Sequence, residues 1–188
     1  MLNGKASVLF GGNAGGYLRA IAAPTSALAQ SSIFSASAYF FSFVGQFAAQ
    51  ANGGNVYTAP NAGPFSSEAG YGATLRQAGG TLVQTIYEGS YEETAVTQAA
   101  SVPVLVQGRF RAGTVKLLEL RVGKGALVLE PTDSTAVLSD AFLLASSQGL
   151  LGDWTGHIQE LITGQYAATD AELNDLADRA ASLWGVTL

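Results

Sequence analysis

One segment of this chain, residues 34–48, is apolar on both of the faces that an extended backbone presents. In a β-strand successive side chains point to opposite faces, so two sets of positions alternate along it. One set here holds Tyr39, Phe41, Phe43 and Phe47, and the other holds Ala36, Ala38, Phe40 and Val44. A strand of this kind has no face for water, so we expect it in the middle of a β-sandwich rather than in a sheet with a wetted face.

Almost everything before residue 165 alternates between short apolar runs and turn-forming sequence rich in Gly and Asn. About a dozen strands at this spacing suit an all-β fold built from two antiparallel sheets. We expect strands at Val8–Phe10, Tyr17–Ile21, Phe34–Ala48, Val56–Tyr57, Gly72–Gln77, Thr81–Tyr87, Glu92–Gln98, Val102–Arg111, Thr114–Val122, Ala126–Glu130, Ala141–Ser146 and His157–Thr163.

A single helix is predicted after these strands. Thr169 and Glu172 have the spacing of a capping box, in which the Thr hydroxyl accepts from the Glu amide and the Glu carboxylate reaches back to Thr. Apolar residues then recur at helical spacing up to Trp184, and Gly185 follows where a glycine commonly ends a helix. We therefore expect a helix over Asp170–Trp184.

Composition excludes several classes of protein. The chain has 188 residues, 48% of them hydrophobic, so it can bury the core of one domain spanning residues 1–188. It contains no cysteine, which removes disulfides, thiolate catalysis and cysteine-ligated metals. The net charge is −5 and the nine Lys and Arg residues are scattered, so binding to nucleic acid has no electrostatic support.

Two further observations concern membranes and export. The most apolar stretch, residues 33–49, is interrupted by Ser, Gly and Gln, so we expect no membrane insertion. The first five residues lack the basic and apolar regions of a secretory signal peptide. We expect the chain to fold in the compartment where it is made.

The two ends of the chain carry a family resemblance. The C-terminal part contains Gly152–Ile162, then Ala168–Glu172 opening the helix, then Leu183-Trp184-Gly185, and the N-terminal part contains Ser7–Phe10, Tyr17-Leu18 and Phe34–Phe40. In this order they resemble the concanavalin A-like lectin/glucanase (laminin-G-like) jelly-roll domain, of the kind found in bacteriophage structural proteins. The resemblance implies a two-sheet antiparallel jelly-roll sandwich with one C-terminal helix at about residues 170–184.

Glycoside hydrolysis is one chemistry that such a domain could perform. Glucan-cutting relatives place acidic residues at alternate positions of one strand, and a retaining pair of carboxyl groups lies about 5 Å apart. Here Glu88, Glu92 and Glu93 come nearest, but Gly and Ser interrupt the run and no Asp lies between them. We interpret these residues as a solvated hairpin end. We expect no catalytic residues, no metal site and no cofactor.

Two single residues have structural interpretations. His157 is the chain's one histidine, and no serine lies in a nucleophile-elbow motif, so we expect it to be a surface or half-buried structural residue. Glu160 shares strand parity with Ile158 and Ile162, which indicates a carboxylate on a buried face. The resemblance implies that Glu160 is a scaffold residue, and we expect it to bind backbone amides of a neighbouring loop.

Sugar binding is the chemistry that remains. Lectin-like sites combine an aromatic face with amide and backbone donors on loops at the ends of sheets. We predict glycan-binding candidates among the Asn and Tyr residues of two segments, although the same residues would also serve as turn formers and rim packing. They are Asn52, Asn55, Tyr57, Tyr87 and Tyr91.

Two hypotheses about function follow. The first is a non-catalytic virion protein of a bacteriophage, a head decoration, spike or tail-fibre component made in the host cytoplasm. Its partners would be other virion proteins, copies of itself and host cell-surface polysaccharide. The second is a stand-alone carbohydrate-binding lectin module, and a glycoside hydrolase comes a distant third.

Overall fold

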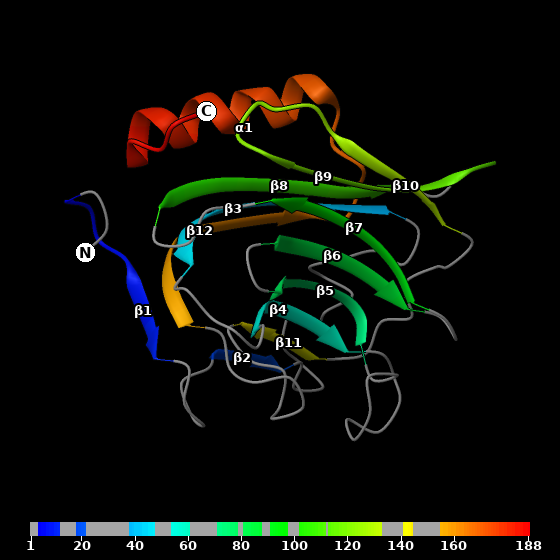
Figure 1. Cartoon of the computed structure of the whole chain (residues 1–188), viewed down its shortest axis with the longest axis horizontal. Coiled ribbons are helices and arrows are strands. Elements are labelled where there is room, and N and C mark those ends of the chain that lie inside the picture. Colours follow the sequence, from blue (N-terminus) through cyan, green and yellow to red (C-terminus); the bar gives the residue numbers. More distant parts are fainter. Residues whose placement is uncertain are drawn as a thin grey trace.

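A computed structural model describes residues 4–11, 18–21, 38–47, 54–60, 71–78, 81–87, 91–97, 102–111, 113–132, 141–144 and 155–188. These residues form two six-stranded antiparallel sheets and one helix (Figure 1). Each expected strand has a counterpart, so the predicted all-β sandwich with a C-terminal helix is confirmed.

The strands divide evenly between the sheets. The first sheet has the order β1 (Val8–Gly11), β12 (Thr155–Gly164), β3 (Ala38–Phe47), β8 (Pro103–Arg111), β9 (Lys116–Val122), β10 (Val128–Thr132). The second sheet has the order β2 (Leu18–Ile21), β11 (Ala141–Leu144), β4 (Gly54–Pro60), β5 (Tyr71–Ala78), β6 (Thr81–Tyr87), β7 (Tyr91–Thr97).

Strand β3 explains why the chain needs a segment that is apolar on both faces. It lies inside the first sheet, between β12 and β8. Tyr39, on one face, has its hydroxyl bonded by Gln84 of the second sheet, so this face looks into the sandwich. Phe40 and Val44, on the other face, pack in buried clusters with residues of the C-terminal helix. The second face is thus covered by the helix.

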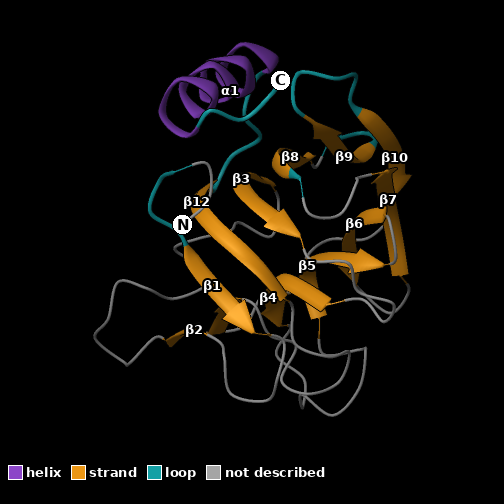
Figure 2. Cartoon of the chain, turned by 60° about the vertical axis from the view of Figure 1, so that its left-hand side comes forward, coloured by secondary structure: helices purple, strands orange, loops and turns teal. Residues whose placement is uncertain are grey.

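The helix, α1 (Asp170–Trp184), has the predicted bounds. The capping box is present, with the amide of Glu172 donating to Thr169 Oγ1 and the amide of Thr169 donating to Glu172 Oε2. Gly185 ends the helix at φ 68°, a left-handed conformation that glycine adopts without strain. Both views show α1 on the side of the first sheet that faces away from β5 and β6 (Figure 1 and Figure 2). Within the described ranges, the chain has no helix long and apolar enough to cross a membrane.

Hydrogen bonds join the two sheets across the sandwich. Gln84 Nε2 donates to Tyr39 Oη at 3.1 Å and to the carbonyl of Arg109 at 3.5 Å. Where the edge strands β7 and β10 meet, Thr94 Oγ1 of β7 donates to the carbonyl of Val128 of β10, at 3.4 Å. Complete burial raises the pKa of Tyr39, and the bond from Gln84 only partly opposes this. The phenol is therefore a neutral, structural group.

The shared face predicted for Ile158 and Glu160 from strand parity is wrong, although the Glu160 side chain is only 11% exposed and so lies on a buried face as predicted. In β12 the register shifts between Ile158 and Glu160, so Ile158 pairs with Gly45 and Glu160 pairs with Val44. Gly45 and Val44 are consecutive and lie on opposite faces, so Ile158 and Glu160 do as well. A β-bulge inserts one extra residue and resets the alternation that the prediction assumed.

Gly45 provides a test of the packing between β3 and β12. A Cβ at this position would overlap the carbonyl oxygen of His157 and the ring of Phe43. We expect Gly45→Ala to lower the free energy of unfolding by about 1–3 kcal/mol, since overpacking displaces backbone and ring together. Urea denaturation would measure it. Gly113→Ala is the control, because its Cβ would meet only one atom at an ordinary 3.7 Å, and equal losses in both variants would contradict the expectation.

Candidate functional site

The structure places four of the five predicted glycan-binding residues on the second sheet. Asn55 and Tyr57 lie in β4, Tyr87 ends β6 and Tyr91 begins β7. Asn52 lies outside the described residues, as does Glu88. Tyr87 and Tyr91 pair directly across the β6–β7 ladder.

The backbone register separates these candidates into two pairs. Asn55 is level with Arg76 of β5, which in turn pairs with Val83 of β6. Tyr87 lies four positions beyond Val83 along β6, which is roughly 13 Å in the strand direction. A sugar site formed by one pair is therefore distinct from a site formed by the other. Their role in binding stays a prediction.

His157 has the structural setting that was expected. It is half-buried in β12, and its Nδ1 lies 3.0 Å from the hydroxyl of Ser7. Glu160 has a different setting from the one predicted. Arg179 Nη1 lies 2.6 Å from each of its carboxylate oxygens and Trp184 Nε1 donates to Oε2 at 3.2 Å, so its partners here are side chains of α1 rather than loop amides.

A cluster of charged side chains lies where β8 and β9 meet the start of α1. Glu119 of β9 is 0% exposed and accepts from two arginines of β8. Arg109 donates through Nε at 2.6 Å and Nη2 at 2.9 Å, and Arg111 donates through Nε at 2.6 Å and Nη2 at 2.8 Å. Each carboxylate oxygen therefore accepts two bonds, and none is left for another donor.

Arg109 connects this cluster to the helix. Its Nη1 donates to the carbonyl of Ala168 at 2.6 Å, and its Nη2 lies 2.7 Å from Asp170 Oδ1. The hydrogen bond to Glu119 raises the pKa of Arg109, burial opposes this, and Asp170 adds to the rise. The guanidinium is therefore firmly cationic although it is only 5% exposed.

A second polar group continues the contact along the helix. Gln107 Nε2 donates to the carbonyl of Leu173 at 2.8 Å and to Ser42 Oγ at 3.3 Å. Arg121 donates to Gln107 Oε1, with 2.7 Å for the shorter bond, and to Asn174 Oδ1 at 3.0 Å. Burial lowers the pKa of Arg121, with a smaller effect of Asp170 in the opposite direction. The first turns of α1 are thus bound to the sheet by directional bonds.

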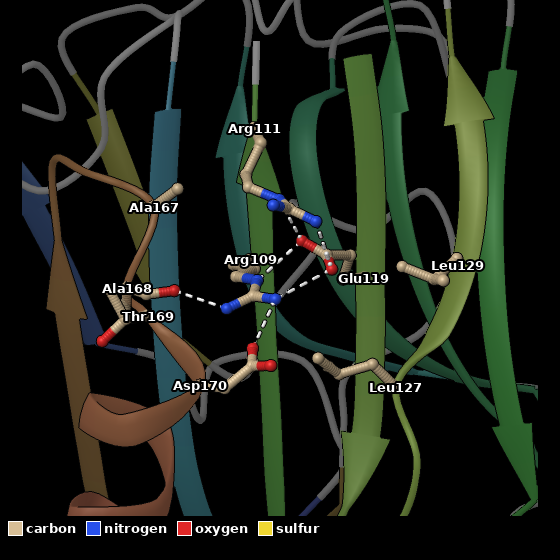
Figure 3. Close-up of a pocket in the computed structure, with 9 residues that line it drawn as sticks. All are labelled: Arg109, Arg111, Glu119, Leu127, Leu129, Ala167, Ala168, Thr169 and Asp170. Carbon is tan, nitrogen blue, oxygen red and sulfur yellow. Dashed lines mark hydrogen bonds and ion pairs between the residues drawn. The ribbon is translucent and has the colours of Figure 1, made fainter. Parts of the chain in front are cut away.

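A pocket of about 480 Å³ opens beside the cluster (Figure 3). We call it the Arg111 pocket. Ala167–Asp170 line one side, Leu127 and Leu129 line the other, and Glu119 lies between them with both arginines (Figure 3). Within the described ranges, no group of three or more His, Cys, Asp or Glu residues is placed to hold a metal ion.

The Arg111 pocket was not predicted from the sequence. Its residues Arg109 and Arg111 share strand parity with Gln107 in β8, and its Glu119 shares strand parity with Arg121 in β9. Polar residues at every second position of two neighbouring strands, with an Arg opposite a Glu, are a signal for a shared polar face. Both strands were predicted, but the complementary charges face each other only in the register that pairs Arg109 with Glu119.

Comparison with solved structures identifies the fold. A botulinum neurotoxin serotype D binding domain superposes with a TM-score of 0.70 at 9% identity, over 100% of this chain and 47% of that one. A serotype D ligand binding domain in complex with N-acetylneuraminic acid gives 0.68 at 10% identity, over 94% and 44%. A serotype D/C binding domain gives 0.67 at 11% identity, over 97% and 47%.

These matches confirm the concanavalin A-like jelly roll that the sequence resemblance implied. At such low identity the likeness concerns the fold. The chain spans less than half the length of the structures that it matches. No protein-family model and no curated protein matches the sequence.

Glu119 provides a test of the charged cluster. We expect Glu119→Gln to lower the free energy of unfolding by about 3–5 kcal/mol, because it leaves the buried Arg109 without its main counter-charge. Chemical denaturation monitored by circular dichroism would measure this. Glu130→Gln, at an exposed position of β10, removes the same charge and should change stability by less than about 0.5 kcal/mol. A small loss in Glu119→Gln would show that the buried carboxylate contributes little to the stability of the fold.

Glu172 provides a test that depends on pH. Bonds from the amide and hydroxyl of Thr169 lower the pKa of Glu172 below its ordinary value. A lowered folded-state pKa stabilises the fold above the ordinary pKa, and this stability is lost as pH falls through the lowered one. We expect the difference in Tm between wild type and Glu172→Gln to be present at neutral pH and to shrink through this acidic range. A difference that stays constant on acidification would contradict the assignment.

Proposed function

We propose that this protein is a non-catalytic recognition module, a lectin-like jelly roll that binds glycans and assembles with other proteins. The observation that carries the proposal is the likeness of the whole chain to binding domains of a neurotoxin, one of them in complex with N-acetylneuraminic acid. Lectins of this architecture bind through surface side chains and need no reactive group.

The most buried carboxylates in the described part of the chain support a binding role over a catalytic one. Glu119 has both oxygens saturated by arginine, and Glu160 is bound by Arg179 and Trp184. A general acid or nucleophile needs an oxygen that can reach a substrate. Both carboxylates instead hold parts of the fold together.

A more specific form of the proposal concerns where the module works. We propose a component of a bacteriophage virion, such as a head decoration, spike or tail fibre, that is made in the host cytoplasm. There it packs against other virion proteins and copies of itself, and it attaches to cell-surface polysaccharide. The sequence resemblance supports this form. The alternative is a stand-alone lectin module, which the N-acetylneuraminic acid complex of the structural neighbour favours.

Light scattering tests this proposal. The mass of the purified protein is measured alone and with a panel of bacterial surface polysaccharides, and we expect a homo-oligomer that binds at least one of them. A monomer that binds a glycan would favour the stand-alone lectin over the virion component. An oligomer indifferent to every glycan would contradict glycan binding.

Substitution of the predicted sugar-contacting tyrosines extends the test. We expect Tyr91→Ala to weaken binding of a glycan from the panel roughly tenfold, because an aromatic face contributes packing that alanine lacks. Leu9→Ala is the control, since Leu9 is a 63% exposed apolar residue of β1 and belongs to neither candidate site. Equal affinity of Tyr91→Ala and wild type would remove Tyr91 from the site.

A further inference from the structure

Arg111 differs from Arg109 and Arg121, the other two arginines near the start of α1, because nearly half of its side chain is exposed. It is 44% exposed, while Arg109 and Arg121 are each 5% exposed. Its Nε and Nη2 donate to Glu119, and among the described residues its Nη1 has no hydrogen-bond partner. The bonds to Glu119 fix the guanidinium at the Arg111 pocket, so the Nη1 group can donate to an anion that enters the pocket.

The charges around Arg111 select for a weakly charged anion. Arg109 and Arg111 line the pocket together with Glu119 and Asp170, so two positive charges face two negative ones. A group with two negative charges, such as a phosphate monoester, would meet repulsion from both carboxylates. A single carboxylate carries half that charge, and it can accept from Nη1 of Arg111, which the bonds to Glu119 leave open.

The other walls of the pocket suit a sugar ring that carries this carboxylate. Leu127 and Leu129 provide an apolar surface, and Leu129 is 53% exposed. Asp170 is 71% exposed, and its Oδ1 lies near Arg109, so Oδ2 can accept from a hydroxyl group. Sugars combine an apolar ring face with hydroxyl donors, and a pocket of about 480 Å³ has the volume of a small-molecule site.

We propose that the Arg111 pocket binds an acidic sugar, with Arg111 donating to its carboxylate, Leu127 and Leu129 covering the ring and Asp170 accepting from a hydroxyl. This inference rests on the proposed glycan-binding function and assigns its ligand class and location. The site lies on the first sheet beside α1, away from the tyrosines predicted on the second sheet.

The test uses the full chain and a matched pair of probes, glucuronic acid and glucose, which differ only in the carboxylate. Titrations followed by NMR give the affinity of each, and the polysaccharide panel is run in parallel. We expect wild type to bind glucuronic acid at least tenfold more tightly than glucose, and Arg111→Gln to abolish this preference. Arg179→Gln is the matched control, since Arg179 is 46% exposed and likewise paired with a carboxylate.

A second pair of variants keeps the test decisive if thermal melting shows that Arg111→Gln does not fold. Leu129→Glu adds a negative charge to the wall of the pocket without touching the buried ion pairs, and it should weaken glucuronic acid binding about tenfold. Leu183→Glu makes the same change at a site on α1 that is 45% exposed, and it should bind like wild type.

The outcomes separate this inference from the proposed function. If panel glycans bind but glucuronic acid is not preferred, or if Arg111→Gln and Leu129→Glu keep the preference, the acidic-sugar pocket is wrong and glycan binding stands. If no glycan binds at all, both proposals are wrong. Loss of the preference in the pocket variants alone, with both controls intact, would support the assignment.

Discussion

The buried carboxylate of Glu119 is the interaction on which the outer layer of this structure depends. A carboxylate without exposure to water is costly unless its charge and lone pairs are compensated, and two arginines compensate both here. Arg109, held in place by this pair, reaches the carbonyl of Ala168 and the carboxylate of Asp170. The position of the start of α1 is therefore set by Arg109, the charged side chain of the sheet that Glu119 holds in place.

Apolar and polar contacts contribute differently to the docking of α1. The apolar cluster of Val44, Leu105, Ala177, Ala180 and Val186 removes surface from water, but such contacts tolerate sliding. The bonds from Gln107 and Arg121 to Leu173 and Asn174 are directional and specify one position along the helix axis. Burial of apolar surface thus stabilises the contact between the helix and the sheet, and the hydrogen bonds determine the position of the helix along its axis.

Local sequence patterns predicted the strands and the helix of this fold well, because the signals for a strand or a helix cap lie within a few neighbouring residues. The helix bounds followed from the capping residue Thr169 and from Gly185, whose effects extend over a few neighbours. The placement of Glu160 on the opposite face from Ile158 could not be predicted, because the bulge in β12 is defined by pairing with a distant strand. The Arg111 pocket needed the pairing of β8 with β9 and the placement of Thr169 and Asp170 beside them, which periodicity alone does not supply.

The link between Arg109 and Ala168 spans 59 residues, and it orders events during synthesis. A ribosome releases β8 and β9 well before it releases the segment that carries Ala168 and Asp170. Until then the outer face of the nascent sheet presents Phe40, Val44 and a guanidinium that lacks two of its final partners. Strand β12, which joins β1 to β3, is also released late, so the first sheet is closed only shortly before the last helix covers its outer surface.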